Sequence, residues 1–201
     1  MKILFSPFSP FVRKCLVMAH ELGLKIDLLP SSAHPVNRDR EIIAVNPLGK
    51  VPTFFTDDGQ VLYDSRVICE YLDHLGGGRL IPPPGPGRWS TLTLQSLGDG
   101  MLDAALLARY ETVARPEPQQ WPAWRDAQLD KIETSMAALE AHPEWLRDRF
   151  DIGAITIGCA LWYLDLRFGD NGWRDRHPGL AAWYAAFSQR DSMRQNWQLP
   201  G

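Results

Sequence analysis

A run of proline and glycine residues at 82–87, with the sequence PPPGPG, constrains the fold of this chain more than any other feature. Proline fixes φ and has no backbone N–H, so the run predicts a stiff, non-helical spacer. The segments with strand character precede this spacer, and four helical stretches follow it, at 89–112, 121–141, 152–168 and 180–188. We therefore predict a sheet-containing domain over 1–78, a linker over 79–87 and an all-helical domain over 88–201.

The first domain alternates strands and helices. We expect strands at 2–5, 26–29, 53–56 and 61–63, and helices at 10–23, 38–45 and 65–75. A β-α-β start implies parallel strands with a right-handed crossover, and the turn Asp57-Asp58-Gly59 adds an antiparallel hairpin. The predicted fold class is α/β followed by all-α: a thioredoxin-like domain with a mixed four-stranded sheet, then a helical domain.

Charge and hydropathy narrow the classes of partner. The chain of 201 residues has a formal net charge of −3, shows no basic stripe, and has no stretch close to the roughly 20 apolar residues of a membrane span. It begins with a short strand that runs into a turn, which is too quickly broken for a secretory signal. We therefore expect neither nucleic acid nor a membrane as a partner.

The cysteines and histidines suggest no metal site. Cys15, Cys69 and Cys159 are far apart in the sequence, and each lies in an apolar helical pattern. They read as buried free thiols in a reducing cytoplasm, not as a disulfide framework. The five histidines show no ligand spacing, so we predict that no metal is bound.

The stretch 46–65 carries a candidate binding site. It reads NPLGKVPT, then a hairpin, then Asp64-Ser65 at the start of a helix. Ser65 can cap that helix, whose first N–H groups and dipole favour an anion. The backbone of Val51, just before Pro52, would lie exposed at a strand start, where a short peptide could add as an extra strand with its carboxylate at Ser65. The alternative is a capped helix after a hairpin, with no ligand.

These motifs, in this order and at this spacing, resemble the glutathione-binding half of the glutathione S-transferase family. The resemblance spans essentially the whole chain, more closely up to residue 75 and more loosely afterwards. It implies a cis peptide bond between Val51 and Pro52, a cytosolic protein, a homodimer, and reduced glutathione as cosubstrate. It also implies a small hydrophobic electrophile as the second substrate.

The resemblance also assigns contacts to glutathione. Val51 would bind the cysteine of glutathione through its backbone N–H and C=O. Asp64 and Ser65 would hold the γ-glutamyl end, Ser65 by its hydroxyl and helix N–H, Asp64 near the amine. Lys50 and His34 could approach the glycine carboxylate, although a lysine in such a loop is often only a solvated charge.

The segment between the first strand and the first helix is the candidate catalytic element. Ser9 stands at the N-cap position and Pro10 in the first helical turn, so Ser9 could serve only as a cap. Ser9-Pro10-Phe11 is similar to the Cys-Pro-Phe/Tyr of glutaredoxins and cysteine-type transferases. A serine hydroxyl cannot exchange with disulfides, but it can donate a hydrogen bond to the sulfur of glutathione and so lower the thiol pKa. Ser6 competes for this role, and we prefer Ser9 because it lies at the helix start.

The helical domain would supply the pocket for the electrophile, as the resemblance implies. Our candidates there are Met101, Arg109, Tyr110 and Trp162, with Leu102, Leu106 and Arg167 as further members. Apolar residues at such helical spacing also commonly form a core. Asp99 and Asp103, one helical turn apart, could face the glutathione site or a dimer interface, or could lie on a solvated face.

Two further positions depart from simple patterns. Asp151 caps an apolar helix, but Ala154 replaces the second acid of the family's capping box, so this helix could be less firmly nucleated. Arg13 and Lys14 open the first helix, at the end where the dipole disfavours cations. We expect Arg13 at a surface or an interface, although it could instead contribute to the electrostatic field at the sulfur.

Three functions remain open. The first is conjugation of glutathione to an electrophile, with Ser9 stabilising the thiolate. The second is a non-catalytic binding or regulatory role on the same fold, as in stringent starvation proteins. The third is glutathione-dependent reduction or isomerisation. The sequence does not identify the electrophile.

Overall fold

The computed structural model describes residues 1–197, and its contacts divide the chain into two compact units. The first unit holds Met1–Arg88 together with the described residues from 191 on, and the second is Trp89–Arg190. The sequence predicts one helical domain over 88–201, whereas residues 191–197 group with the first unit. The reason is a long-range contact: Arg13 donates hydrogen bonds to the carbonyls of Met193 and Gln195.

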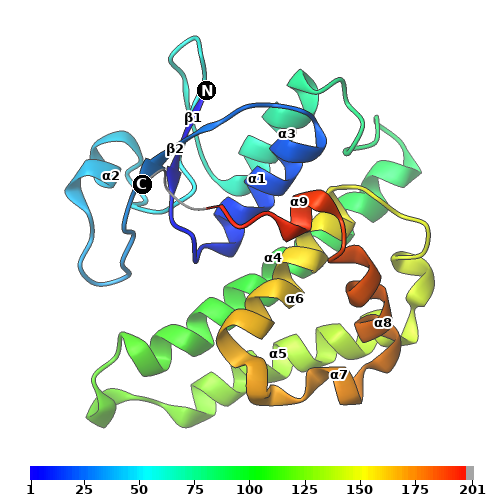
Figure 1. Cartoon of the computed structure of the whole chain (residues 1–201). Helices are drawn as coiled ribbons and strands as arrows, with labels where there is room; N and C mark the ends of the chain where they lie inside the picture. Colours follow the sequence, from blue (N-terminus) through cyan, green and yellow to red (C-terminus); the bar gives the residue numbers. More distant parts are fainter. Residues whose placement is uncertain (198–201) are drawn as a thin grey trace. The chain divides into compact units, whose positions relative to one another are not determined.

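The first unit contains a four-stranded sheet with the order β2-β1-β3-β4 (Figure 1). Its strands are β1 (Lys2–Phe5), β2 (Asp27–Pro30), β3 (Phe54–Phe55) and β4 (Val61–Leu62). β1 and β2 are parallel, and the pairs β1–β3 and β3–β4 are antiparallel. The helices are α1 (Pro10–Glu21), α2 (Arg40–Val45), α3 (Ser65–Leu75) and the short α9 (Asp191–Arg194). This topology confirms the predicted thioredoxin-like layout.

The core of the first unit lies between the sheet and two helices. The cross-strand partners Ile3 and Phe54 are fully buried, and α1 packs beside α3 (Figure 1). Cys15 of α1 and Cys69 of α3 meet there, with their Sγ atoms 3.9 Å apart, and both are free thiols. Burial of these apolar side chains holds α1 and α3 against the sheet and so fixes where each helix begins.

The second unit is helical. Its helices are α4 (Pro86–Val113), α5 (Pro122–Ala141), α6 (Ile152–Phe168), α7 (Trp173–Arg176) and α8 (Pro178–Phe187). The sequence predicted these helices except α7, and it also missed α9 of the first unit, because four residues are too few to show helical periodicity. Residues 152–161 of α6 are all buried, so this helix forms the core of the unit. In the described residues no helix is both long and apolar enough to cross a membrane.

The start of α6 is held more firmly than its half capping box suggests. One carboxylate oxygen of Asp151 accepts a hydrogen bond from Ala154 N at 3.0 Å. The other accepts from Thr91 Oγ1 at 2.7 Å and pairs with Arg149 Nε at 2.9 Å. Side chains outside the helix therefore stabilise Asp151 in place of the missing second acid.

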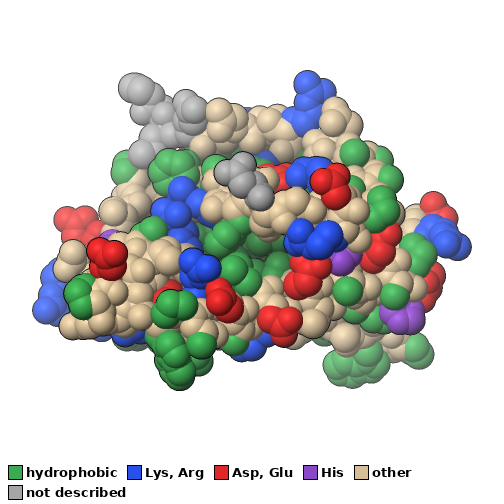
Figure 2. Space-filling view, turned by 90° about the horizontal axis from the view of Figure 1, so that it is seen from below, with side chains coloured by type: hydrophobic (Ala, Val, Ile, Leu, Met, Phe, Trp, Pro, Cys, Tyr) green, Lys and Arg blue, Asp and Glu red, His purple; other side chains and the backbone are tan. Residues whose placement is uncertain are grey.

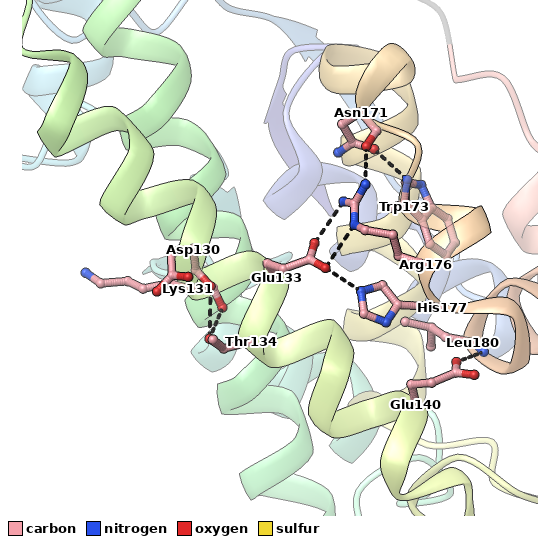
Figure 3. A network of polar contacts seen from close by, with 10 residues as sticks. All are labelled: Asp130, Lys131, Glu133, Thr134, Glu140, Asn171, Trp173, Arg176, His177 and Leu180. Atoms are coloured by element: carbon pink, nitrogen blue, oxygen red, sulfur yellow. Dashed lines mark hydrogen bonds and ion pairs between the residues drawn. The ribbon is translucent and has the colours of Figure 1, made fainter.

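A polar network joins α5 to the segment 171–180 (Figure 3). Glu133 accepts hydrogen bonds from Arg176, and it lies 2.9 Å from His177 Nε2. Glu140 accepts from the backbone N–H groups of Gly179 and Leu180, at the first turn of α8. These hydrogen bonds, above all that from Arg176 to Glu133 and that from Leu180 to Glu140, lower the pKa of both carboxyl groups.

Basic and acidic side chains are interspersed on the face shown in Figure 2, around hydrophobic side chains at its centre. Several acids of the second unit are paired with arginines, as in the ion pair of Glu133 with Arg176 and that of Asp165 with Arg174. Pairs of this exposed kind contribute little to stability, typically up to about 1 kcal/mol each.

Candidate functional site

The register of the sheet brings three predicted segments to one end of the first unit. Ile3 pairs with Phe54 and Phe54 with Leu62, both in antiparallel ladders. The end of β1, the start of β3 and the end of β4 therefore lie side by side. Leu4 N donates to Thr53 O at 2.8 Å, which fixes this alignment. The loop with Ser9, the segment with Val51 and the turn with Ser65 thus lie at the same end of the sheet.

Ser9 is the N-cap of α1, as the sequence predicts. Its Oγ accepts a hydrogen bond from Val12 N at 3.3 Å, and Pro10 occupies the first helical position. Ser9 N donates to Ser6 O at 3.1 Å, so the two serines begin and end one tight turn. A hydroxyl that accepts one hydrogen bond still has its own proton to donate. Capping and donation to a bound sulfur are therefore compatible at Ser9.

Asn46 organises the segment that leads to Val51. Its side chain is 1% exposed, and its Nδ2 donates to Thr53 Oγ1 at 2.8 Å and to Lys50 O at 3.2 Å. Its Oδ1 accepts from Leu48 N at 3.0 Å. Asn46 belongs to the motif NPLGKVPT, but we predicted no role for it from the sequence. An asparagine just before a Pro-Leu-Gly turn is a recognisable signal for such a loop clamp.

Val51 presents an unpaired stretch of backbone. The Val51–Pro52 peptide bond is cis, as the resemblance implies, and Pro52 is buried. Within residues 1–197 neither the N–H nor the C=O of Val51 makes a hydrogen bond. A donor and an acceptor on one residue at a strand start can pair with an extended peptide.

The start of α3 differs from the sequence prediction in its capping residue. We expected Ser65 to cap the helix, but Asp64 is the N-cap, with its Oδ1 2.9 Å from Arg66 N. Asp64 has extended backbone angles, whereas Ser65 already belongs to the helix. The peptide bond between Tyr63 and Asp64 is also cis. Ser65 is 3% exposed, and within the described residues its hydroxyl and N–H form no hydrogen bonds, so both remain available to a ligand.

Lys50 and His34 lie in loops at the same end of the sheet. Both side chains are exposed, and within residues 1–197 neither makes a hydrogen bond to Ser9, Val51 or Ser65. His34 Nδ1 accepts hydrogen bonds from Val36 N at 3.2 Å and from Asn37 N at 3.0 Å, so it shapes its own loop. Their predicted contact with a glycine carboxylate stays a prediction.

Arg13 is buried within this chain and not exposed at its surface, and Lys14 beside it is buried as well. Lys14 is 0% exposed and its Nζ lies 5.7 Å from the centre of the Phe11 ring. Arg13 is buried by the segment 191–197, to whose carbonyls it donates, and its guanidinium lies 5.3 Å from the centre of the Trp197 ring. The sequence could not show this, because the partners of Arg13 are about 180 residues away in the chain.

The candidate acceptor residues lie on α4 and α6 of the second unit. Met101 is almost fully buried, whereas Arg109, Tyr110 and Trp162 are half-buried. Tyr163, beside Trp162, was not among the candidates; it is 2% exposed. Burial raises the pKa of both Tyr110 and Tyr163, so both phenols are neutral near pH 7.

Asp99 and Asp103 do not share a solvated face. Asp99 is fully buried, and Asp103 is exposed. Of the alternatives that the sequence left open, a solvated face shared by Asp99 and Asp103 is therefore excluded. Among residues 1–197 the structure holds no group of three or more His, Cys, Asp or Glu side chains that could bind a metal.

Comparison with known proteins decides the family. The model of the glutathione S-transferase N-terminal domain matches residues 8–75, and that of the C-terminal domain matches residues 122–186. The GST-like protein YibF of Escherichia coli K12 is 32% identical over 96% of each chain. The chain belongs to the glutathione S-transferase family. The fold class predicted from the sequence is that of this family.

Solved structures of the family members agree in fold over the full chain. A Pseudomonas fluorescens Pf-5 family member with bound glutathione has a TM-score of 0.94 and 46% identity, and covers 100% of this chain and 99% of its own. A second structure from the same organism holds S-(propanoic acid)-glutathione, with 46% identity, a TM-score of 0.89 and full coverage of both chains. A Methylobacillus flagellatus KT transferase with glutathione bound has 36% identity, covers 98% of this chain and 99% of its own, and has a TM-score of 0.89.

Proposed function

We propose that this transferase-family protein binds reduced glutathione in its first unit and activates the thiol for attack on a small electrophile. One observation carries the proposal. Ser9, the unpaired backbone of Val51 and the unpaired hydroxyl of Ser65 lie at one end of the sheet. The backbone donor and acceptor of Val51 and the hydroxyl of Ser65 are groups to which an extended tripeptide with an anionic end can bind.

Each part of glutathione has a matching group in this proposal. The cysteine residue of glutathione pairs with the N–H and C=O of Val51 as an added strand would. The γ-glutamyl carboxylate accepts hydrogen bonds from the hydroxyl and N–H of Ser65, at the positive end of the α3 dipole. The amine of the same residue lies near the exposed carboxylate of Asp64. Lys50 and His34 remain the proposed partners of the glycine carboxylate.

Ser9 acts on the sulfur. Its hydroxyl donates a hydrogen bond to the thiolate and not to the thiol, which favours the charged form and lowers the thiol pKa. The thiol proton passes to water. The sulfur then forms a bond to an electrophilic carbon, and the electron pair of the broken bond leaves with the leaving group or moves onto the acceptor. Serine itself forms no covalent intermediate.

The ligands of the relatives support this reading. Two family members hold glutathione, and one holds S-(propanoic acid)-glutathione, in which the sulfur of glutathione is bonded to a carbon of propanoic acid. That is the type of product that conjugation gives. Disulfide reduction is less well supported, because Ser9 lacks the thiol that would form a mixed disulfide.

We also propose a homodimer and a reducing cytoplasm as the location. The exposed side of α4 carries an open groove of about 460 Å³, and Trp89 at its edge is 67% exposed. Such an apolar groove suits a protein partner. The three free, buried cysteines suit a reducing compartment. Light scattering at micromolar protein tests the dimer, and a monomer mass would contradict it.

Calorimetric titration with reduced glutathione tests the binding site. Ser65→Ala removes a hydroxyl that donates to a carboxylate, so affinity should fall about tenfold or more. Ser135→Ala, on α5, removes a hydroxyl that bonds only within its own helix and should leave affinity unchanged. Absence of heat at millimolar glutathione in the wild type would contradict the proposal. Binding without turnover of any acceptor would favour a binding or regulatory role.

A further inference from the structure

Helices α1 and α3 of the first unit run side by side in the same direction. Cys15, in the middle of α1, has its Sγ atom 3.9 Å from that of Cys69, in the middle of α3. The C-caps of the two helices, Leu22 and Gly76, also meet, because a Cβ added to Gly76 would lie 2.5 Å from Leu22 Cδ2. Contacts between the middles and between the C-terminal ends make the helices parallel, so their N-terminal ends lie at the same end of the unit.

The two cysteines form a sulfur pair in the core of this unit. Both side chains are 0% exposed, and both are thiols, so the structure shows the reduced form of the pair. The S–S bond of a disulfide is about 2 Å long, so each sulfur has to move by only about 1 Å to close one. Rotation about the Cα–Cβ bonds and a small tilt of the helices supply a movement of this size.

We propose that Cys15 and Cys69 are a redox modification site, at which a hydroperoxide converts the two thiols into a disulfide. One sulfur, as thiolate, bonds to an oxygen of hydrogen peroxide; the O–O bond breaks, and the hydroxide that leaves takes up the thiol proton to give water. The second sulfur attacks the sulfenic acid so formed, the S–O bond breaks, and a second water leaves with the second thiol proton. Overall, two thiols and one peroxide give one disulfide and two waters, and the peroxide gains the two electrons that sulfur loses.

Burial decides which oxidants reach the pair. Helices α1 and α3 must separate locally before a sulfur meets an oxidant, so the first step depends on local opening of the core. Hydrogen peroxide is small enough to react in a narrow opening, whereas glutathione disulfide would have to place a tripeptide between two packed helices. In a reducing compartment the pair therefore rests as thiols and responds to peroxide, at a rate that the opening limits.

The disulfide acts on the glutathione site, and this part of the inference rests on the proposed function. Cys15 Sγ lies 3.9 Å from Ser65 O, within reach of a weak S–H hydrogen bond, and a disulfide has no S–H to donate. At the C-terminal ends, Leu22 and Gly76 leave no room for approach, so drawing the sulfurs together tilts α1 against α3. The tilt displaces the N-terminal ends, which carry Ser9 and Ser65, and oxidation should therefore weaken glutathione binding.

Peptide mapping of the peroxide-treated full chain tests the disulfide. Trypsin cleaves after lysine and arginine, which places the pair in peptides 15–25 and 67–79 and Cys159 in a different peptide. After remaining thiols are blocked with N-ethylmaleimide in denaturant, wild type should give the first two peptides joined and lighter by two hydrogens than their sum. Cys69→Ala should not give the joined peptides. Cys159→Ala is the matched control, because it changes an equally buried cysteine of the second unit, and it should still give them.

Recovery of both cysteines as N-ethylmaleimide adducts after peroxide, a sulfinic acid on either one, or a link to any other peptide would overturn the inference. These outcomes need no variant, so they decide the disulfide even if Cys69→Ala fails to fold.

Glutathione sulfonate tests the effect on the glutathione site, because it has no thiol and cannot reduce the disulfide. In calorimetric titrations its affinity should be about tenfold lower for oxidised than for reduced wild type. Reduction of the oxidised protein with dithiothreitol should restore the affinity. Equal affinities of the two forms would contradict the coupling of the pair to the site. No binding by the reduced protein would contradict the proposed function, and the coupling with it, while the peptide map decides the disulfide independently.

Discussion

At the scale of single residues, the proposed function gives Ser9 two tasks that one hydroxyl can perform together: capping α1 and stabilising a thiolate. Its oxygen accepts from Val12 N and so caps α1, while its proton remains free for a sulfur. The helix N-terminus adds a partial positive charge at the same place. A serine there stabilises a thiolate without competing as a nucleophile, because its own pKa is far too high without a general base.

Ser9→Ala separates these tasks. Loss of the donor to the thiolate should lower kcat/KM for conjugation about 100-fold, as loss of one donor to a developing anion does elsewhere. Loss of the cap should cost about 1 kcal/mol of unfolding free energy. Steady-state kinetics and urea unfolding measure the two effects. Ser6→Ala is the control, and an equal kinetic loss there would assign the role to Ser6 instead.

Local sequence predicted the cap at Ser9 and failed at Ser65, for a physical reason. A cap depends on one residue and the turn after it. Proline favours the first helical position, so Pro10 places the N-cap at Ser9. Asp64 and Ser65 are both good caps, and the hairpin before them decides which one stays extended. The burial of Arg13 could not be predicted from local sequence, because it depends on carbonyls at the far end of the chain.

At the scale of elements, α6 shows how tertiary contacts replace a missing local signal. Ala154 cannot complete a capping box, yet Asp151 is held by Thr91 on α4 and by Arg149. The sequence shows the missing acid, but it cannot show which distant side chain compensates. Helix periodicity, in contrast, predicted α4, α5, α6 and α8 to within a few residues.

Asp151→Ala should therefore destabilise the protein more than loss of an ordinary cap. The change removes the bond to Ala154 N and leaves the buried hydroxyl of Thr91 without this acceptor. We expect a loss of about 2–3 kcal/mol in unfolding free energy, measured by denaturant titration with circular dichroism. Asp151→Asn keeps the shape and should lose less. A loss below that of Ser9→Ala would contradict the importance of Thr91.

The network of Glu133 and Glu140 makes stability depend on acid pH. Hydrogen bonds, from Arg176 to Glu133 and from Leu180 N to Glu140, lower the pKa of these carboxyl groups in the folded state. A depressed pKa contributes stability that is complete above the unfolded value of 4.5 and is lost as the pH falls through the folded value. Thermal unfolding temperatures of wild type should therefore fall as the solution is acidified below that value.

Glu140→Gln tests this directly. The variant keeps one acceptor oxygen, for one of the two N–H groups of α8, and its amide does not titrate. Its unfolding temperature should therefore fall less steeply with acidification than that of wild type. Glu117→Gln, in an exposed 3₁₀ turn between α4 and α5, is the control and should follow the wild-type curve. Identical slopes for Glu140→Gln and wild type would contradict the role of Glu140.

At the scale of the whole molecule, the proline-glycine spacer located the change from sheet to helices, and the structure places the unit boundary close to it, at Arg88. The spacer could not show that residues 191–197 return to the first unit. Ser192 Oγ lies 2.5 Å from Glu21 Oε1 and Arg13 bonds Met193, so side chains of α1 hold this segment. The helix that carries Ser9 is thus tied at both of its ends.

The most direct test of the central claim is the pKa of the glutathione thiol when bound. It is measured by titrating the ultraviolet absorbance of the thiolate in the complexes of wild type and of Ser9→Ala with saturating glutathione. We expect a thiol pKa about 1–2 units below that of free glutathione in wild type, and a return toward the free value in Ser9→Ala. A bound thiol that titrates like free glutathione in wild type, or equally low in both proteins, would contradict thiol activation by Ser9.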